Sequence, residues 1–461
     1  MPNRREFLST GAVFLTALPV FHDNASANPS MREKAKERLD PGMKRVRDGL
    51  EYARQHKKSN RSPVLREEIL DNPGAVFILQ TDISSVKDED GKFPPEYEQF
   101  MRAGYDTARI MFRPVTERGG VTCIKPNFVG GFDADERNVN NGISTHPSFV
   151  AGFCDALKEM GNTGIVVGAN GAATHDRFVE SGICEMFHLR DVCFTEGKYK
   201  SWADYDRSEV IWVDYPDGVV MKRVPFFRLV KEKDTTFINM AKDRIHNLGI
   251  TTLTIKNLQG IMPVGYMHIC GGWPSNLNRG TVKNVFNPEY QKEIERLYVK
   301  HARMNFKHWD EYGYARAYFD AGGWDAYRKG AFEPDARVFW FEQWAQRIMD
   351  VASNITPYIN IVEGIVGIDG ANFLYLNNFV TMSCSMAACD SVTSWLMGHD
   401  PRELYYTRIA SERGLGEYDI EKIPIFEITG RGIERVRDYR TLPRARMGVN
   451  IYNQGKELTF F

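Results

Sequence analysis

The sequence lacks the cysteine spacing on which many metal and cluster sites depend. It has seven cysteines, and no two of them are separated by only two residues. Zinc ribbons and ferredoxin-type clusters use closely spaced Cys-x-x-Cys pairs. We therefore expect no iron–sulfur cluster and at most one divalent ion, bound through histidine and carboxylate, while the identity of any cofactor stays open. Free cysteines in apolar segments such as Val121–Ile124 are expected to pack as small hydrophobes.

An excess of basic residues and a membrane-spanning run are also missing. The formal net charge is −1, whereas a nucleic-acid-binding protein normally has a strong basic excess. After the N-terminal region, no apolar run approaches the ~20 residues that a membrane helix needs. We therefore expect a protein that binds no nucleic acid and has no stable membrane insertion.

The N-terminal residues have the layout of a twin-arginine export signal. Arg4 and Arg5 precede Phe7 and Leu8, a short apolar run follows, and small residues end the segment at Ala27. This order is typical of signals read by the twin-arginine translocase, which carries folded proteins. The alternative is an ordinary basic N-terminus. We predict a signal peptide over residues 1–27 and an exported, periplasmic mature chain.

Beyond this segment the pattern predicts an α/β fold, a mostly parallel sheet flanked by helices. Short apolar strands alternate with helices of similar length, as in parallel sheets. Residues 28–75 are charged and predict a helical arm without strands. Residues 76–265 and 351–461 predict the α/β core, and 266–350, with five tryptophans, predict an inserted helical subdomain. Strands are predicted over the following ranges: 75–80, 120–124, 163–168, 192–194, 209–213, 219–224, 235–240, 358–364 and 423–429. The ranges 209–213 and 219–224 are predicted to form an antiparallel hairpin.

The first candidate site residues follow the strand that ends at Ile124. Lys125 and Asn127 stand there, and in open parallel sheets ligands bind beyond the carboxyl ends of strands. Both could bind a substrate, or they could form a surface turn. His146 precedes Pro147 at a predicted helix start, so it is either a general acid or base or a helix cap.

A glycine loop follows the next strand. Gly168 and Asn170 stand between a predicted strand and a predicted helix, where backbone amides can bind an anion. The loop is neither a Gly-x-Gly-x-x-Gly motif nor a Walker motif, so it predicts no nucleotide.

The densest polar cluster spans Lys242 to Asn257. Lys242 and His246 end one strand, and Lys256 and Asn257 interrupt an apolar run. A lysine in such a run must be paired or neutral when buried, so it meets either a carboxylate of the protein or an anionic ligand. Asp390, on a predicted buried helix, is a candidate catalytic group. It is expected either to pair with one of these lysines or to cap a helix.

At these residues the chain resembles a widespread prokaryotic family called domain of unknown function 362. Matching stretches occur in one order along the chain: Ile124–Val129, Thr145–Pro147, Lys242–His246, Leu253–Gly260, Asn360–Gly367, Ala388–Val392, Leu396–Pro401 and Arg413–Gly416. Many members carry a separate ferredoxin module, which this chain lacks. It also departs from the family pattern at Ala169, where an acidic residue is expected, and at Ser385–Met386, where Asp-Pro is expected. The lysine–histidine motif has two extra residues, and 266–350 lies outside the resemblance.

Two functions remain open from the sequence. The first is an enzyme acting on an anionic small molecule or sugar acid, in which Lys125, Lys242 and Lys256 hold the anion. His146 or His246 would then move protons, and the reaction class is open. The second is a redox accessory protein that holds a cofactor or metal without turnover of its own.

Overall fold

The computed structural model describes residues 49–56, 58–85, 97–115, 119–128, 142–169, 178, 181–196, 210–246, 249–262, 336–370 and 373–448. The predicted signal peptide, the candidate Asn170 and most of the predicted insertion lie outside these residues. All statements on the fold concern the described part of the chain.

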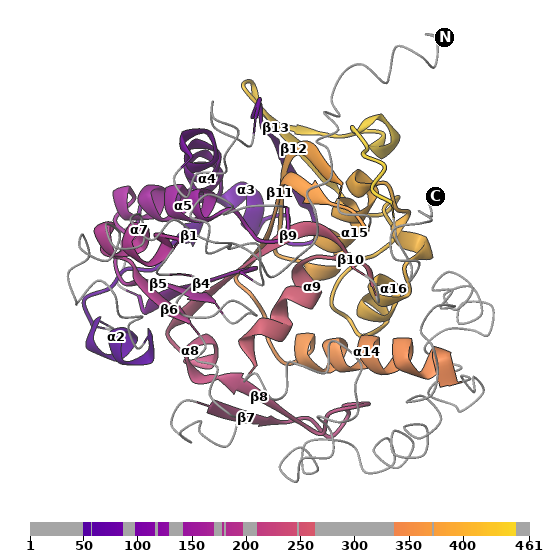
Figure 1. Ribbon diagram of the computed structural model, residues 1–461, viewed down its shortest axis with the longest axis horizontal. Helices are drawn as coiled ribbons and strands as arrows, with labels where there is room; N and C mark the ends of the chain where they lie inside the picture. The colour runs from indigo at the N-terminus through magenta and orange to yellow at the C-terminus, as the bar shows by residue number, and fades with distance from the viewer. Residues whose placement is uncertain are drawn as a thin grey trace, which may run out of the picture.

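One large sheet forms the centre of the molecule (Figure 1). Its strands are β2 (Val76–Gln80), β4 (Val121–Pro126), β5 (Ile165–Ala169), β6 (Cys193–Glu196), β9 (Thr235–His246), β10 (Ile250–Thr252), β11 (Ile359–Ile368), β12 (Leu374–Ser383), β13 (Ile425–Thr429) and β14 (Gly432–Arg435). Their order is β14-β13-β2-β12-β11-β9-β4-β5-β6, with β10 paired to β9. The five strands from β11 to β6 run parallel to one another. The α/β fold predicted from the alternation of strands and helices is therefore confirmed.

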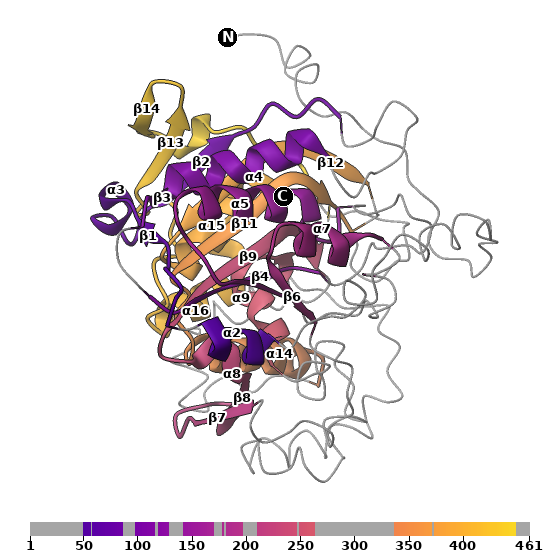
Figure 2. The same ribbon diagram turned by 90° about the vertical axis from the view of Figure 1, so that its left-hand side faces the viewer.

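Helices cover both faces of this sheet. The first face packs against α4 (Glu98–Met111), α5 (Pro147–Glu159) and α7 (Ile183–Leu189), and α4 and α5 lie in front of the sheet in Figure 2. The second face packs against α9 (Thr254–Asn257), α14 (Ala336–Ala352), α15 (Met386–Met397) and α16 (Tyr405–Glu412). We call these the α5 face and the α9 face.

Small elements complete the described chain. They are α2 (Gly49–His56), α3 (Glu67–Leu70), α8 (Arg228–Lys231), the 3-10 turns Leu258–Ile261, Pro401–Glu403 and Tyr439–Thr441, and the strand pairs β1 (Val64–Leu65) with β3 (Phe112–Arg113) and β7 (Val210–Asp214) with β8 (Arg223–Phe227). The predicted arm thus contributes helix α2, as expected, but also strand β1, which its charged composition did not indicate. Two residues are too few to show the alternation that identifies a strand.

Close packing of α4 against α5 fixes the position of the α5 N-terminus. A Cβ atom on Gly104 would come within 1.9 Å of the carbonyl oxygen of Phe149, and one on Gly152 within 1.8 Å of that of Met101. Only glycine permits this approach of the two backbones. The helix begins at Pro147, a residue favoured in the first turn.

The hairpin formed by β7 and β8 corrects one predicted strand. Residues 219–224 were expected to be extended, but β8 begins only at Arg223. The backbone N–H groups of Val219, Val220 and Met221 all donate to the carboxylate of Asp350 on α14, at 2.7–3.0 Å. A buried carboxylate that accepts three N–H groups competes directly with strand pairing, and nothing local in the apolar sequence reveals it.

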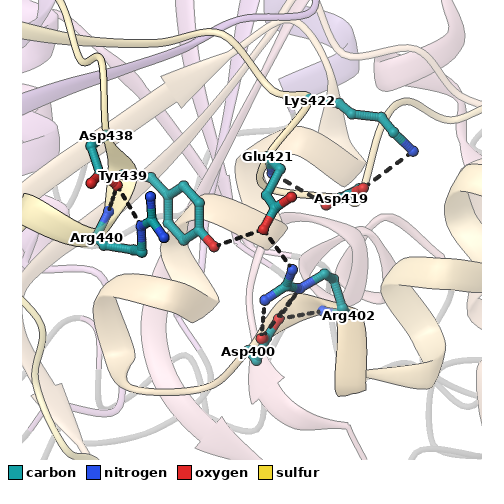
Figure 3. A network of polar contacts seen from close by, with 8 residues as sticks. All are labelled: Asp400, Arg402, Asp419, Glu421, Lys422, Asp438, Tyr439 and Arg440. Carbon is teal, nitrogen blue, oxygen red and sulfur yellow. Dashed lines mark hydrogen bonds and ion pairs between the residues drawn. The ribbon is translucent and has the colours of Figure 1, made fainter.

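A surface network links the C-terminal turns (Figure 3). Arg402 donates to Asp400 at 2.7 Å and to Glu421 at 3.0 Å, and the hydroxyl of Tyr439 donates to Glu421 at 3.3 Å. The pairs Asp419–Lys422 and Asp438–Arg440 lie beside it. Exposed pairs of this kind contribute about 0–1 kcal/mol each, so the network orients the turns more than it stabilises the fold.

No helix in the described part of the chain is long and apolar enough to span a bilayer.

Candidate functional site

Lys125 stands at the carboxyl end of β4 and begins a chain of buried amides. Its Nζ donates to Oδ1 of Asn257 on α9. The Asn257 amide donates to the Lys125 carbonyl at 3.2 Å and to Oδ1 of Asn239 at 2.8 Å. Asn239 in turn donates to the carbonyl of Thr254 and to Oδ1 of Asn360, both at 2.9 Å. We call Lys125, Asn257, Asn239 and Asn360 the Lys125 cluster. It joins β4, α9, β9 and β11 through neutral groups.

The amine of Lys125 has no carboxylate partner among the described residues. Burial, reinforced by the positive charge of Lys256, lowers the pKa of Lys125 to about 7. The physical cause is that a desolvated ammonium without a counter-charge is costly, so the neutral amine is favoured. The residue keeps 5% exposure. Near neutral pH, Lys125 is therefore divided between amine and ammonium.

Lys242, on the neighbouring strand β9, has the opposite environment. Its Nζ lies 2.8 and 2.7 Å from the two carboxylate oxygens of Glu363 on β11, and 3.8 Å from Oδ1 of Asp243. Glu363 also accepts from the backbone N–H groups of His146 and Ile365, at 3.1 and 3.0 Å. We call Lys242, Glu363, Asp243 and His146 the Lys242 cluster. Its lysine is held in a fully buried ion pair.

Asp243 is the second carboxyl of the Lys242 cluster. Its Oδ2 accepts from the amide of Asn377 at 2.7 Å, and its buried Oδ1 has no hydrogen-bond partner in the described chain. Burial raises the pKa of Asp243 to about 7, with a further rise from Glu363 that Lys242 opposes. One lysine cannot neutralise two buried carboxylates, so Asp243 takes up a proton more readily than an ordinary aspartate.

His146 caps helix α5 and leaves one ring nitrogen unused. Its Nδ1 accepts from the backbone N–H of Ser148 at 3.1 Å, and its ring stacks on Phe100 with centroids 4.0 Å apart. Its buried Nε2 has no hydrogen-bond partner among the described residues. Burial and then the charge of Lys242 hold the pKa of His146 well below its usual value. Since Nδ1 is an acceptor, Nε2 carries the proton of the neutral ring.

The two lysines lie on opposite faces of the sheet, whereas Asp243, which follows Lys242 on β9, lies on the face of Lys125, where the Asn377 amide contacts both Asp243 and Met447. Lys125 is in register with Asn239, and Glu363 with Lys242. Neighbouring side chains along a strand point to opposite faces, so Lys125 and Asn239 project toward α9, and Lys242 and Glu363 toward α5. The surrounding core residues agree with this division, because Cys123 and Ala241 pack on the α9 face whereas Ile124 and Met240 pack on the α5 face.

His246 and Lys256 belong to the α9 side. The His246 ring stacks on Trp344 of α14, with centroids 5.6 Å apart. Burial, followed by the charges of Lys256 and Arg244, lowers the pKa of His246 well below its usual value. Lys256 therefore acts electrostatically on both Lys125 and His246, which makes these three residues one electrostatic group.

Asp390 has the second of the two roles expected from the sequence, because it caps a helix and does not pair with a lysine in the described chain. It forms no ion pair with a lysine in the described structure, and it does not cap its own helix, α15, which Ser385 caps instead. Its carboxylate accepts from the backbone N–H groups of Thr254 and Ile255, at 2.8 and 3.2 Å, and from the Thr254 hydroxyl. It thus caps α9 from the side. Burial raises the pKa of Asp390 to about 7, although these hydrogen bonds oppose the rise.

The other candidates fall near the same strand ends. The Asn127 N–H donates to the Thr145 hydroxyl at 3.0 Å, and its amide donates to the Ile143 carbonyl at 3.3 Å. Asn127 thereby holds the segment that leads into α5. Gly168 is partly exposed near the end of β5, and a Cβ atom there would meet only Thr195.

Sequence reasoning omitted four residues of the two clusters: Asp243, Glu363, Asn239 and Asn360. Glu363 is a carboxylate inside the apolar strand Ile359–Ile368, the same signal that singled out Lys256. Asn239 and Asn360 also interrupt apolar strands. A search for polar residues within apolar runs would have found Glu363, Asn239 and Asn360, but not the groups that they contact.

No metal site is formed by the described residues, in the sense of three or more His, Cys, Asp or Glu side chains gathered together. The described cysteines form no disulfide with one another, and all but Cys384 are buried. Burial raises the pKa of Cys123 to about 12, so its thiol is a poor ligand and nucleophile.

Comparison with known proteins gives one match. The model of the family described as Domain of unknown function (DUF362) matches residues 122–394. No curated protein matches the chain, and no solved structure matches it. The matched range contains every residue of the two clusters.

Proposed function

We propose a function from the geometry of the site itself: the chain belongs to the family described as Domain of unknown function (DUF362), and that description names no reaction. The proposed function is an enzyme that binds an anionic small molecule, such as a sugar acid, on the α9 face. Lys125 and Lys256 would bind the anionic group, and His246 would move the proton.

One observation carries this proposal: Lys125 is buried, its Nζ donates to an amide oxygen and has no carboxylate partner in the described chain, and the charge of Lys256 acts on it. Two neighbouring cations repel each other, and an anion placed between them would relieve this repulsion and restore the proton of Lys125. Lys242 is a weaker candidate, because Glu363 already compensates its charge. Lys242 and His146 would support the site from the α5 face.

Neutral histidines suit proton transfer near pH 7. The pKa of His246 lies well below its usual value, so its ring can accept a proton from a substrate. An anion beside Lys256 would oppose this lowering and raise the basicity of His246 at the moment of binding. The bound anion would therefore also make His246 a stronger base.

Calorimetry tests the proposal through its proton balance. Glucuronate, lactate and phosphate would each be titrated into the protein at pH 8 in two buffers with different ionisation enthalpies. Binding should take up a fraction of a proton, since it raises the pKa of Lys125 from about 7. The Lys125→Met variant should lose this uptake. Binding of none of the three anions, or binding without proton uptake, would contradict the proposal.

We also propose that the chain is exported by the twin-arginine translocase, on the strength of Arg4–Arg5 and the segment that follows. Replacing both arginines by lysine keeps the charge and should retain the folded protein in the cytoplasm. Unchanged recovery from the periplasm, in a strain without the translocase, would exclude this route.

A further inference from the structure

We infer that Lys125 is a nucleophilic amine, which forms a reversible imine with the carbonyl group of an anionic aldehyde or 2-oxo acid. The inference rests on the proposed function, because Lys256 would bind the anionic group of the same substrate. That anion raises the pKa of Lys125, so the attack uses the fraction of the amine that stays neutral in the complex. It adds the substrate's chemical class and a covalent step.

The position of Lys125 meets the structural requirement for such an amine. A lysine acts as a nucleophile only when neutral, which proteins achieve by desolvation or by a neighbouring cation. Lys125 has both: it is buried, and Lys256 lies beside it. In the described chain, its Nζ donates a hydrogen bond to an amide oxygen, that of Asn257. That bond orients the amine and uses one N–H, while the lone pair stays available.

Among the described residues, the groups that bond to Lys125 and to the amides around it do not supply a counter-charge. From β9 and β11 come the neutral amides of Asn239 and Asn360, which bond to each other. From α9 comes the cation Lys256. The hydrogen-bonding network reaches the carboxylate of Asp390 on α15 through Thr254, and Asp390 accepts from Thr254 and Ile255. Asp243 lies four residues after Asn239 on β9 and accepts from Asn377. The pKa of about 7 follows from this arrangement.

Lys242 provides the internal contrast. It is 0% exposed and bound to both oxygens of Glu363. An ammonium in a bidentate ion pair has no free lone pair. The two buried lysines of the strand ends are thus suited to different tasks, and only Lys125 is suited to attack.

The chemical step balances without a redox partner. The lone pair of Nζ forms a C–N bond to the carbonyl carbon, and the carbonyl π electrons move to oxygen, which takes a proton. The resulting carbinolamine loses that oxygen as water, and the C=N bond forms. The nitrogen gives up its two N–H protons during these steps, to solvent directly or through His246, and they equal in number the two protons that leave with the oxygen as water. Addition of water reverses the sequence.

Reductive trapping tests the inference on the full, unsubstituted chain. Protein at pH 7.5 is incubated with glyoxylate and cyanoborohydride, and the modified residues are mapped by mass spectrometry. Cyanoborohydride supplies the hydride that fixes the imine as a secondary amine. The expected product is Lys125 carrying the mass of glyoxylic acid less one oxygen, formed at least tenfold faster than at Lys231. Lys231 is the matched comparison, because burial also lowers its pKa but its Nζ contacts only the Asn354 carbonyl and the Phe226 ring among the described residues.

The pH profile separates reactivity from mere accessibility. At glyoxylate concentrations far below saturation, where the rate reports the free protein, trapping at Lys125 should rise with a midpoint near pH 7. In Lys256→Met the midpoint should move upward, because the neighbouring charge is gone. A variant that only loosened the structure would also raise the midpoint, because water would reach Lys125, but it would lose stability in urea unfolding, whereas Lys256→Met should not. Equal labelling of Lys231, or no labelling of Lys125, would overturn the inference.

Combined with the calorimetry, the outcomes are distinguishable. Anion binding with proton uptake but without trapping overturns the imine and leaves the proposed function standing. Trapping at Lys125 without any anion binding supports the amine and overturns the proposed anion site. Absence of both overturns both.

Discussion

Lys125 and Lys242 lie on adjacent parallel strands, near the same edge of the sheet, and both are buried. Lys125 meets an amide oxygen beside another cation. Lys242 meets a carboxylate with both oxygens in reach. The same residue type is therefore a titratable amine on the α9 face and a fixed cation on the α5 face.

This difference shows that the partner, more than burial, decides what a buried lysine can do. An ion pair in a low-dielectric interior is strong only while both partners are present, and removing one leaves an uncompensated charge. A lysine held by amides can release its proton instead and stay buried as a neutral group. We therefore expect the two lysines to respond differently to the same substitution, and four predictions follow that difference from its largest effect to its smallest.

Lys242→Met should give the largest loss of stability. It leaves Glu363 buried and without its cation, and removal of one partner of a buried pair costs about 3–5 kcal/mol. Urea unfolding of the wild type and the variant at pH 7 measures the change. The double variant Lys242→Met, Glu363→Leu should recover much of the loss. A change below about 1 kcal/mol in the single variant would show that the ion pair does not have the role assigned to it.

The pH dependence of stability should distinguish Lys125. Its pKa is about 7 in the folded chain and about 10.4 when unfolded. Between these values the unfolded state binds more protons, so the free energy of unfolding rises with pH, by at most about 1.4 kcal/mol per pH unit. Lys125→Met should remove this rise between pH 7 and pH 9. Lys231→Met, the matched variant with a partly exposed amine, should remove less. Equal slopes in the wild type and Lys125→Met would contradict a lowered pKa.

At constant pH 7, Lys125→Met should change stability little. The variant removes a buried amine that is costly to keep, but it leaves Oδ1 of Asn257 without its donor, which costs about 1–3 kcal/mol. These effects oppose each other, so we expect a net change below about 1.5 kcal/mol in urea unfolding. A loss as large as that in Lys242→Met would place Lys125 among the structural cations.

Much of this comparison could be predicted from the sequence, but not its central feature. Apolar runs ending in Lys125 and in Lys242–His246 correctly indicated strands of a parallel sheet with polar groups near their carboxyl ends. The face on which each lysine lies depends on which residue of β4 is level with which residue of β9. That register is set by long-range pairing and is not encoded locally.

The partners of these buried charged groups could not be predicted from the sequence for the same reason. Glu363 is far from Lys242 in sequence, and only the pairing of β9 with β11 brings them level. Asp390 was expected either to pair with a lysine or to cap a helix, since a buried carboxylate needs a partner, and its own sequence could not decide between the two. Its carboxylate accepts from backbone N–H groups at the start of α9. A helix N-terminus carries partial positive charge, so it can satisfy a carboxylate in place of a cation. The hairpin boundary at Arg223 was missed because its cause, Asp350, lies on α14.

Lys256→Met should have the smallest effect on stability and the most specific effect on Lys125. Lys256 is partly exposed, and its positive charge lowers the pKa of Lys125, so its removal should leave the protein as stable as before or slightly more stable. The pKa of Lys125 should rise, and the pH window in which stability increases should begin at higher pH. Urea unfolding from pH 6 to pH 9 measures both quantities at once. If Lys256 instead served mainly as the partner of an internal carboxylate, the variant would lose stability at every pH in this range, and the melting temperature would fall by more than about 8 °C, at about 2–4 °C per kcal/mol. That result would show that Lys256, like Lys242, is a cation paired with a carboxylate. Its charge would then no longer help to explain the lowered pKa of Lys125.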